Sequence, residues 1–145
     1  MLLTLSMGNT QPEAENFSTI EIVNAKTGRI YGRRNIEKTG EFAIEFIHSV
    51  NNSTVREIYR LEEKEIRSTA VRFYSFGAGM QAELEDGQQI IRDGDALVIT
   101  GLSRIFPELN YIVGTVSDHI LLINNESISL GKLCGKNTPV TLRVK

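Results

Sequence analysis

The feature that most constrains the fold of this chain is an alternating pattern that runs from Phe42 to Leu61. Apolar residues recur at every second position on both sides of a polar stretch at 51–54. A period of two is typical of strands that bury one face, and a short polar interruption predicts the reversal of an antiparallel hairpin. We therefore expect two adjacent strands with inward faces formed by Phe42, Ile44, Phe46, His48 and Val50, and by Val55, Glu57, Tyr59 and Leu61.

Each inward face contains one polar residue, His48 in the first strand and Glu57 in the second. If residues 51–54 form the loop, Val50 pairs with Val55, and the imidazole of His48 lies opposite the carboxylate of Glu57. Such a pair has three interpretations: a hydrogen-bonded clamp that pins the end of the hairpin, one wall of a ligand site, or part of a metal site.

The rest of the chain predicts further short strands and no long helix. Segments rich in β-branched residues alternate with turns rich in Gly, Asn and Asp, for example at 19–23, 96–100 and 119–123. The segment 66–76 has no cleanly apolar alternate set, which predicts a bulged strand. About nine strands at this spacing, without an amphipathic helix of three turns, predict an all-β fold: an antiparallel β-sandwich, with a partly open β-barrel as the alternative.

The length and composition are those of one globular domain, because 145 residues, 41% of them hydrophobic, can bury a core of their own. We expect this domain to span 17–145. Residues 1–16 join a short apolar run, MLLTLSMG, to a polar stretch. They resemble the remnant of a signal or anchor segment and its linker, which predicts an extracytoplasmic location; a frayed cytoplasmic N-terminus is the alternative.

Charge and cysteine content exclude several partners. A net charge of −2 with interspersed acids and bases provides no electrostatic footprint for nucleic acid and no polybasic membrane patch. Membrane attachment is therefore expected only through an N-terminal anchor. The single cysteine, Cys134, excludes an internal disulfide and any multi-cysteine metal site. No cofactor is predicted.

A glycine pair follows the predicted bulged strand at Gly77, Ala78 and Gly79. Glycines there allow positive φ or close approach of the backbone, and successive amides can form an anion-binding concavity. The spacing is not that of a dinucleotide fingerprint or a P-loop. A bulge or chain reversal is the alternative interpretation.

Taken in order, several short motifs resemble a known family. They are His48-Ser49-Val50, Glu57-x-Tyr59, Phe73-x-Ser75-Phe76-Gly77-Ala78-Gly79, Gly101-x-x-Arg104 and His119-x-Leu121. Together they are similar to an uncharacterised bacterial domain family that is commonly encoded beside TAXI-type tripartite (TRAP) solute transporters. The resemblance runs from about 42 to 144. It implies an extracytoplasmic, transport-linked protein and no established reaction.

Two kinds of site remain open for these residues. In the first, His48, the amides of 77–79 and Arg104 hold an anionic solute such as a dicarboxylate. In the second, His48, Glu57 and His119 form a metal set of two imidazoles and a carboxylate, as in a metal-dependent hydrolase. The candidate ligand-binding residues are His48, Glu57, Gly77, Ala78, Gly79, Arg104 and His119.

Nucleophilic catalysis is not favoured by the residue pattern. Ser49 follows His48 directly, so in a strand the two side chains point to opposite faces. The chain also lacks a G-x-S-x-G elbow. We therefore expect a non-catalytic binding domain, an accessory of a TRAP-type transporter that binds a small anionic solute or a transporter protein.

Overall fold

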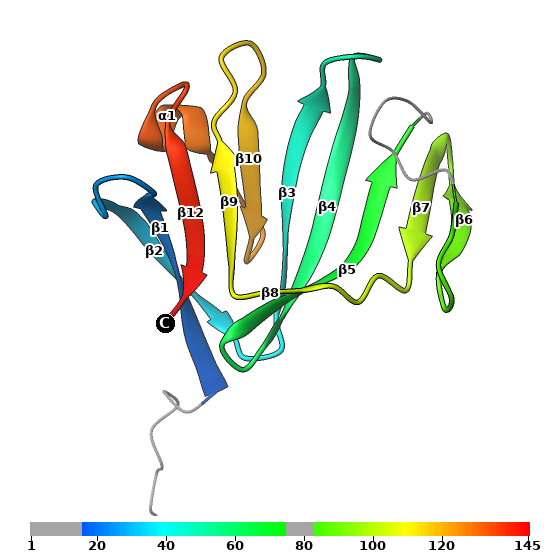
Figure 1. Cartoon of the computed structure of the whole chain (residues 1–145), viewed down its shortest axis with the longest axis horizontal. Coiled ribbons are helices and arrows are strands. Elements are labelled where there is room, and N and C mark those ends of the chain that lie inside the picture. The colour runs from blue at the N-terminus through cyan, green and yellow to red at the C-terminus, as the bar shows by residue number, and fades with distance from the viewer. Residues whose placement is uncertain (1–15, 75–82) are drawn as a thin grey trace, which may run out of the picture.

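The computed structural model describes residues 16–74 and 83–145. These residues form two antiparallel sheets and one short helix (Figure 1). The elements are β1 (Phe17–Asn24), β2 (Ile30–Glu37), β3 (Glu41–His48), β4 (Ser53–Glu62), β5 (Glu65–Phe73), β6 (Gln89–Asp93), β7 (Ala96–Thr100), β8 (Ile105–Phe106), β9 (Glu108–Ile112), β10 (His119–Ile123), β11 (Glu126–Ser129), α1 (Leu130–Cys134) and β12 (Pro139–Val144).

The smaller sheet has the strand order β2-β1-β12-β9, and the larger has the order β11-β10-β3-β4-β5-β7-β6 with β8 added beside β5. Neither sheet closes on itself, which confirms the predicted all-β sandwich and excludes the barrel alternative for the described residues. The described strands number twelve, more than the nine or so expected. The excess includes pieces such as β8, whose two residues are too few for a period to be visible in the sequence.

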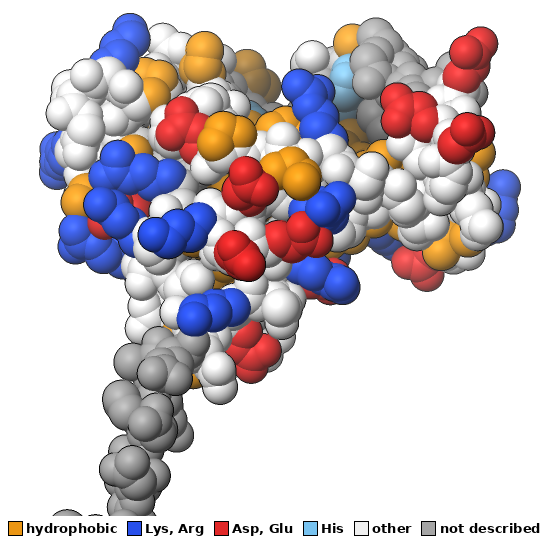
Figure 2. Space-filling view, turned by 60° about the horizontal axis from the view of Figure 1, so that its bottom comes forward, with side chains coloured by type: hydrophobic (Ala, Val, Ile, Leu, Met, Phe, Trp, Pro, Cys, Tyr) orange, Lys and Arg blue, Asp and Glu red, His pale blue; other side chains and the backbone are white. Residues whose placement is uncertain are grey.

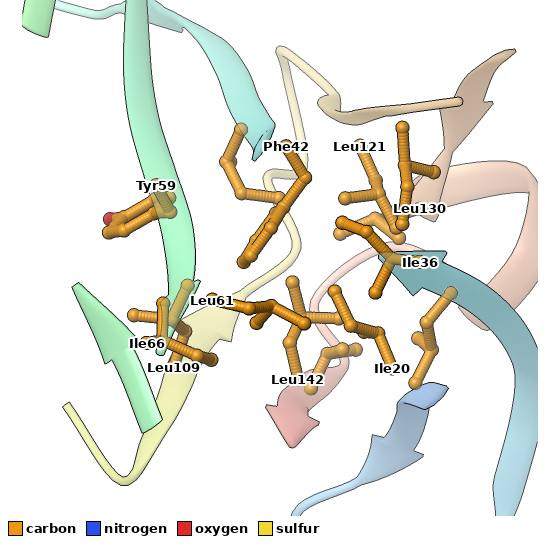
Figure 3. Packing of buried hydrophobic residues seen from close by; sticks show 14 of the residues in the cluster. Ile20, Ile36, Phe42, Tyr59, Leu61, Ile66, Leu109, Leu121, Leu130 and Leu142 are labelled. Carbon is orange, nitrogen blue, oxygen red and sulfur yellow. The ribbon is translucent and has the colours of Figure 1, made fainter. Parts of the chain in front are cut away.

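The main core lies between the two sheets (Figure 3). Alternate residues of β1 and β12 in the smaller sheet face those of β3, β4 and β10 in the larger, as the period of two requires. Helix α1 adds Leu130, which is fully buried. Ten of these core residues are labelled in Figure 3: Ile20, Ile36, Phe42, Tyr59, Leu61, Ile66, Leu109, Leu121, Leu130 and Leu142.

A second, smaller core forms where the larger sheet extends past the smaller one, toward β7 and β6 (Figure 1). Val55, Phe73 and Ile99 are its buried members, and Phe46 packs against both cores. The larger sheet therefore has one region sandwiched by the smaller sheet and another that packs only on its own side chains.

The bulge predicted in the third strand is present in β5. The pairing of β4 with β5 shifts register between Ile58 and Tyr59, and Thr69 is the extra residue. A single inserted residue reverses which alternate positions face inward. Ile66 and Phe73 are both fully buried for this reason, although an odd number of positions along the strand takes one to the other.

The hairpin of β3 and β4 has a different register from the predicted one. His48 pairs with Ser53, and Glu57 pairs with Ile44, so the predicted pairing of His48 with Glu57 is wrong by four residues. The reversal takes place at 49–52, where Asn52 adopts a φ of 53° and Asn51 accepts hydrogen bonds from the backbone and hydroxyl of Ser53. An even shift keeps both side chains on the predicted face.

Ion pairs lie on the opposite face of the same hairpin. Glu45 bonds Arg56 at 2.6 Å and Glu41 bonds Arg60 at 3.0 Å, and each pair joins residues directly opposite in register. Acidic and basic side chains are likewise interspersed over the middle of the face seen in Figure 2. Exposed pairs of this kind contribute at most about 1 kcal/mol each, so they mark the solvent side of the sheet more than they stabilise it.

Candidate functional site

A cleft of about 520 Å³ opens on the inward face of the larger sheet, where the two cores meet. Its walls come from the hairpin, from β5 and from the segment that follows β7. The volume is within the range of about 300–1,000 Å³ usual for small-molecule sites. Lining residues include Phe46, His48, Val55, Glu57, Tyr59, Ser68, Leu102, Arg104 and Phe106. Three predicted ligand-binding residues, His48, Glu57 and Arg104, therefore share one cleft.

The carboxylate of Glu57 accepts hydrogen bonds from two tyrosines. The hydroxyls of Tyr59 and Tyr111 each lie 2.9 Å from Oε2 of Glu57, and the two hydroxyl oxygens are 2.9 Å apart. Burial and the nearby carboxylate raise the pKa of both phenols, which keeps them neutral donors. Tyr111 comes from β9 of the smaller sheet, so this cluster ties the two sheets together.

Arg104 reaches the cleft from the connection between β7 and β8. Its guanidinium lies over the ring of Phe106, 4.9 Å from the centroid, and its side chain is exposed. The backbone carbonyl accepts the amide of Ser68 at 2.9 Å, which fixes the connection to β5. Among the described residues, no carboxylate forms an ion pair with Arg104, so its charge is available to a ligand.

Gly101 explains why this connection can pass so close to its neighbour. Its φ of 77° favours glycine, and a Cβ there would collide with the carbonyl oxygen of Gly87. The amide of Leu102 then bonds the carbonyl of Thr69, the bulge residue, at 3.2 Å. The Gly-x-x-Arg motif therefore has a physical meaning: the glycine allows the approach that brings Arg104 to the cleft.

His48 does not form the predicted clamp with Glu57. The two lie on the same face but four residues apart along the strand, or about 13 Å. Nδ1 of His48 instead accepts the amide of Val50 at 3.3 Å. His48 is half-buried and forms one end of the cleft.

His119 lies beside the cleft and not in it. It pairs with Phe46 in the sheet, and the two rings stack with centroids 5.4 Å apart. Its Nδ1 accepts the amide of Gly114 at 3.3 Å. Burial is the main cause that lowers the pKa of His119, although the charges of Asp118 and Glu57 oppose this shift. The ring is therefore a packing element behind Phe46.

The alternative metal site is not assembled. No three His, Cys, Asp or Glu side chains of the described segments lie close enough together to hold a metal ion. His48, Glu57 and His119 all belong to these segments. Nδ1 of each histidine accepts a backbone amide, and Oε2 of Glu57 accepts the hydroxyl of Tyr59. The candidate residues Gly77, Ala78 and Gly79 lie outside the described residues.

Sequence reasoning missed the tyrosine partner of Glu57. Tyr59 was placed on the correct face by the alternating pattern, but no local pattern links Glu57 to Tyr111, 54 positions away. Phe106 is likewise not among the candidate residues predicted from the sequence. An aromatic residue two positions after Arg104 was the available signal, because a strand brings alternate side chains to one face.

The fold and the cleft define a class of protein: an all-β sandwich with a small-molecule-sized cleft beside its main core. Residues 42–130 match the model of a family described as "Domain of unknown function (DUF1850)". The match covers more than half of the chain, which therefore belongs to this family, and the expectation of an uncharacterised domain family is confirmed. No curated protein and no solved structure matches the chain. No helix in the described part is both long and apolar enough to cross a membrane.

Proposed function

We propose that this domain is a non-catalytic binding module that takes a small anionic solute into the cleft between its two cores. The observation that carries this proposal is that Arg104, an arginine with no acidic partner among the described residues, lines the same cleft as His48 and Glu57. Arginine presents a planar fork of donors that matches a carboxylate. An apolar wall strengthens each charge-assisted hydrogen bond between the two groups.

The lining favours a solute with an apolar body. Phe46, Val55 and Leu102 contribute hydrocarbon surface, while the polar groups come from only a few positions. Such a combination is usual where a pocket gains affinity from burial and orientation from a few polar contacts. A short-chain carboxylate therefore fits better than inorganic phosphate or sulfate.

A binding role fits the polar chemistry better than catalysis. The hydroxyl of Ser68, the serine in the cleft, lies 3.4 Å from the carbonyl of Arg104 and so is not set against a general base. The tyrosine hydroxyls donate to Glu57. This arrangement orients a carboxylate and does not activate a nucleophile.

The resemblance of the motifs to domains encoded beside TAXI-type TRAP transporters supports a wider role. In this role the domain resides outside the cytoplasm, secreted or anchored, and acts as an accessory of such a transporter. Binding of a transporter protein in place of the solute is the second form of the same role. Pull-down of the transporter's own subunits by the tagged domain tests it.

The cleft itself is tested by thermal shift with succinate, glutarate and hexanoate. We expect at least one carboxylate to raise the melting temperature of the wild-type domain and to lose this effect in Arg104→Gln. Arg92→Gln, a matched change at an exposed position on β6, is expected to keep the shift. A shift that survives Arg104→Gln, or no shift with any of the three, would contradict binding of a simple carboxylate in this cleft.

A further inference from the structure

The cleft presents a negative charge as well as a positive one. Glu57 lines it with a half-buried carboxylate, and both tyrosine hydroxyls bond the same oxygen, Oε2. Among the described residues no hydrogen bond to the other oxygen is seen. A purely anionic solute would therefore meet, in a confined space, a carboxylate of its own sign that has no cationic partner among the described residues.

Aromatic residues line the same cleft as this carboxylate. Phe46 and Tyr59 line the same cleft from the hairpin, and Phe106 meets Tyr59 edge to face with centroids 6.2 Å apart. Aromatic faces attract cations, and the attraction increases when the cation is removed from water. A carboxylate among aromatic rings is therefore an environment that favours an ammonium group.

Arg104 supplies the opposite charge from a different part of the chain. It follows β7, whereas Glu57 lies within β4, and its guanidinium is held over Phe106. The two charges do not neutralise each other, because no ion pair joins Arg104 to Glu57 or to any other acid of the described segments. The two charged groups are thus each available to the opposite group of one ligand.

We propose that the solute is a zwitterion of the amino-acid type, with its ammonium at Glu57 and its carboxylate at Arg104. This inference rests on the proposed function: it keeps a carboxylate group at Arg104 and adds an ammonium group to the solute. A zwitterion satisfies both charges at once, whereas a simple carboxylate satisfies Arg104 and is repelled by Glu57. The preference for an amino acid over its deaminated analogue should therefore depend chiefly on Glu57.

The test is calorimetric titration with matched pairs that share a carbon skeleton: leucine and 4-methylpentanoate, phenylalanine and 3-phenylpropanoate, 6-aminohexanoate and hexanoate. In wild-type protein we expect at least one amino acid to bind about tenfold or more tightly than its partner, the size of one charge-assisted contact. In Glu57→Gln most of this preference should be lost while the deaminated acid still binds. Arg104→Gln should weaken both members of the pair.

The glutamine variant is chosen because its amide oxygen still accepts the hydroxyls of Tyr59 and Tyr111. Its melting temperature, measured alongside, separates loss of charge from loss of fold. Equal or tighter binding of the deaminated acid by wild-type protein would overturn the zwitterion while leaving an anion site intact. A preference of undiminished size in Glu57→Gln would also overturn it. If neither member of any pair binds in a way that depends on Arg104, the proposed function is overturned as well.

Discussion

The carboxylate of Glu57 and the hydroxyl of Tyr111 lie 2.9 Å apart, although they belong to different sheets of the sandwich. The contact closes the end of the main core at the point where the cleft begins, since Glu57 lines the cleft and Tyr111 packs on the core. Glu57 therefore contributes both to the packing of the two sheets and to the lining of the cleft.

Replacing this carboxylate should cost stability. Glu57→Ala removes the acceptor shared by the hydroxyls of Tyr59 and Tyr111. One hydroxyl can then donate to the other, which leaves one donor unsatisfied in a partly buried place, and we expect a loss of about 1–3 kcal/mol in the free energy of unfolding. Glu57→Gln should lose less than half as much, since it keeps an acceptor. Urea denaturation of both variants measures the difference. Equal losses, or no loss in the alanine variant, would contradict the described role of the cluster.

Gly101→Ala should damage the cleft more than the core. A Cβ at this position collides with Gly87, so the connection that holds Leu102 and Arg104 must move. We expect solute binding to weaken, together with a loss of about 1–3 kcal/mol in stability from the strained backbone. Gly28→Ala also changes a glycine of positive φ, 73°, but there a Cβ meets no atom within 4 Å, so it controls for strain alone. Unchanged binding in Gly101→Ala would contradict this role of Gly101.

Acid should destabilise the smaller sheet through Glu21. This glutamate is 3% exposed, and Arg33 and Arg143, directly opposite it on the two neighbouring strands, bond its carboxylate at 2.9 Å. Those bonds lower its pKa below the ordinary 4.5. The unfolded chain therefore takes up a proton at a higher pH than the folded one, so the stabilisation is complete above the ordinary pKa and is lost as the pH falls through the lowered one.

We expect the difference in unfolding free energy between wild-type protein and Glu21→Gln to be largest at neutral pH and to shrink as the pH is lowered from ~7 to ~3. Urea unfolding at several pH values measures it. Glu63→Gln, at an exposed turn, provides the same change of charge as a control. A difference that stays constant over this range would show that the two arginines do not hold Glu21 ionised.

The single cysteine should react slowly. Cys134 is half-buried at the end of α1 and packs against the main core; burial raises the pKa of its thiol to about 11, and the charge of Asp118 adds to the shift. At pH ~8 only about a thousandth of such a thiol is thiolate, the form that reacts. Alkylation by iodoacetamide should therefore be far slower in native protein than in urea. Similar rates in both would contradict the described environment.

The hairpin of β3 and β4 shows most clearly how much of the fold could be predicted from the sequence. The alternation from Phe42 to Leu61 is a strong signal, because burial of one face requires a period of two. It assigned the inward side chains of both strands correctly except for Val50, which lies in the reversal and is exposed. The register depends on the turn, and Asn51 and Asn52 offered more than one way to reverse the chain. Periodicity cannot distinguish registers that differ by an even number of residues, which is why the pairing of His48 with Glu57 was wrong.

The candidate site was predictable in part for a related reason. The alternating pattern of the hairpin alone places His48 and Glu57 on the same face of the sheet, so this part of the site could be predicted from the sequence. The arrival of Arg104 beside them depends on the bulge at Thr69 and on the tight approach at Gly101, and that of Tyr111 depends on how the two sheets stack. Contacts over such separations are set by the packing of the whole domain and leave no local pattern.

The most direct test of the central claim is amide NMR of the labelled domain during titration with the carboxylate or amino acid that raises its melting temperature most. If the cleft is the binding site, the shifts that move should gather at Glu57, Ser68, Leu102 and Arg104, and Arg104→Gln should abolish them. Phe17, Asn35 and Glu126 line a different groove of the domain. Chemical-shift changes that gather around these three residues, with none at Glu57, Ser68, Leu102 or Arg104, would contradict binding in the cleft.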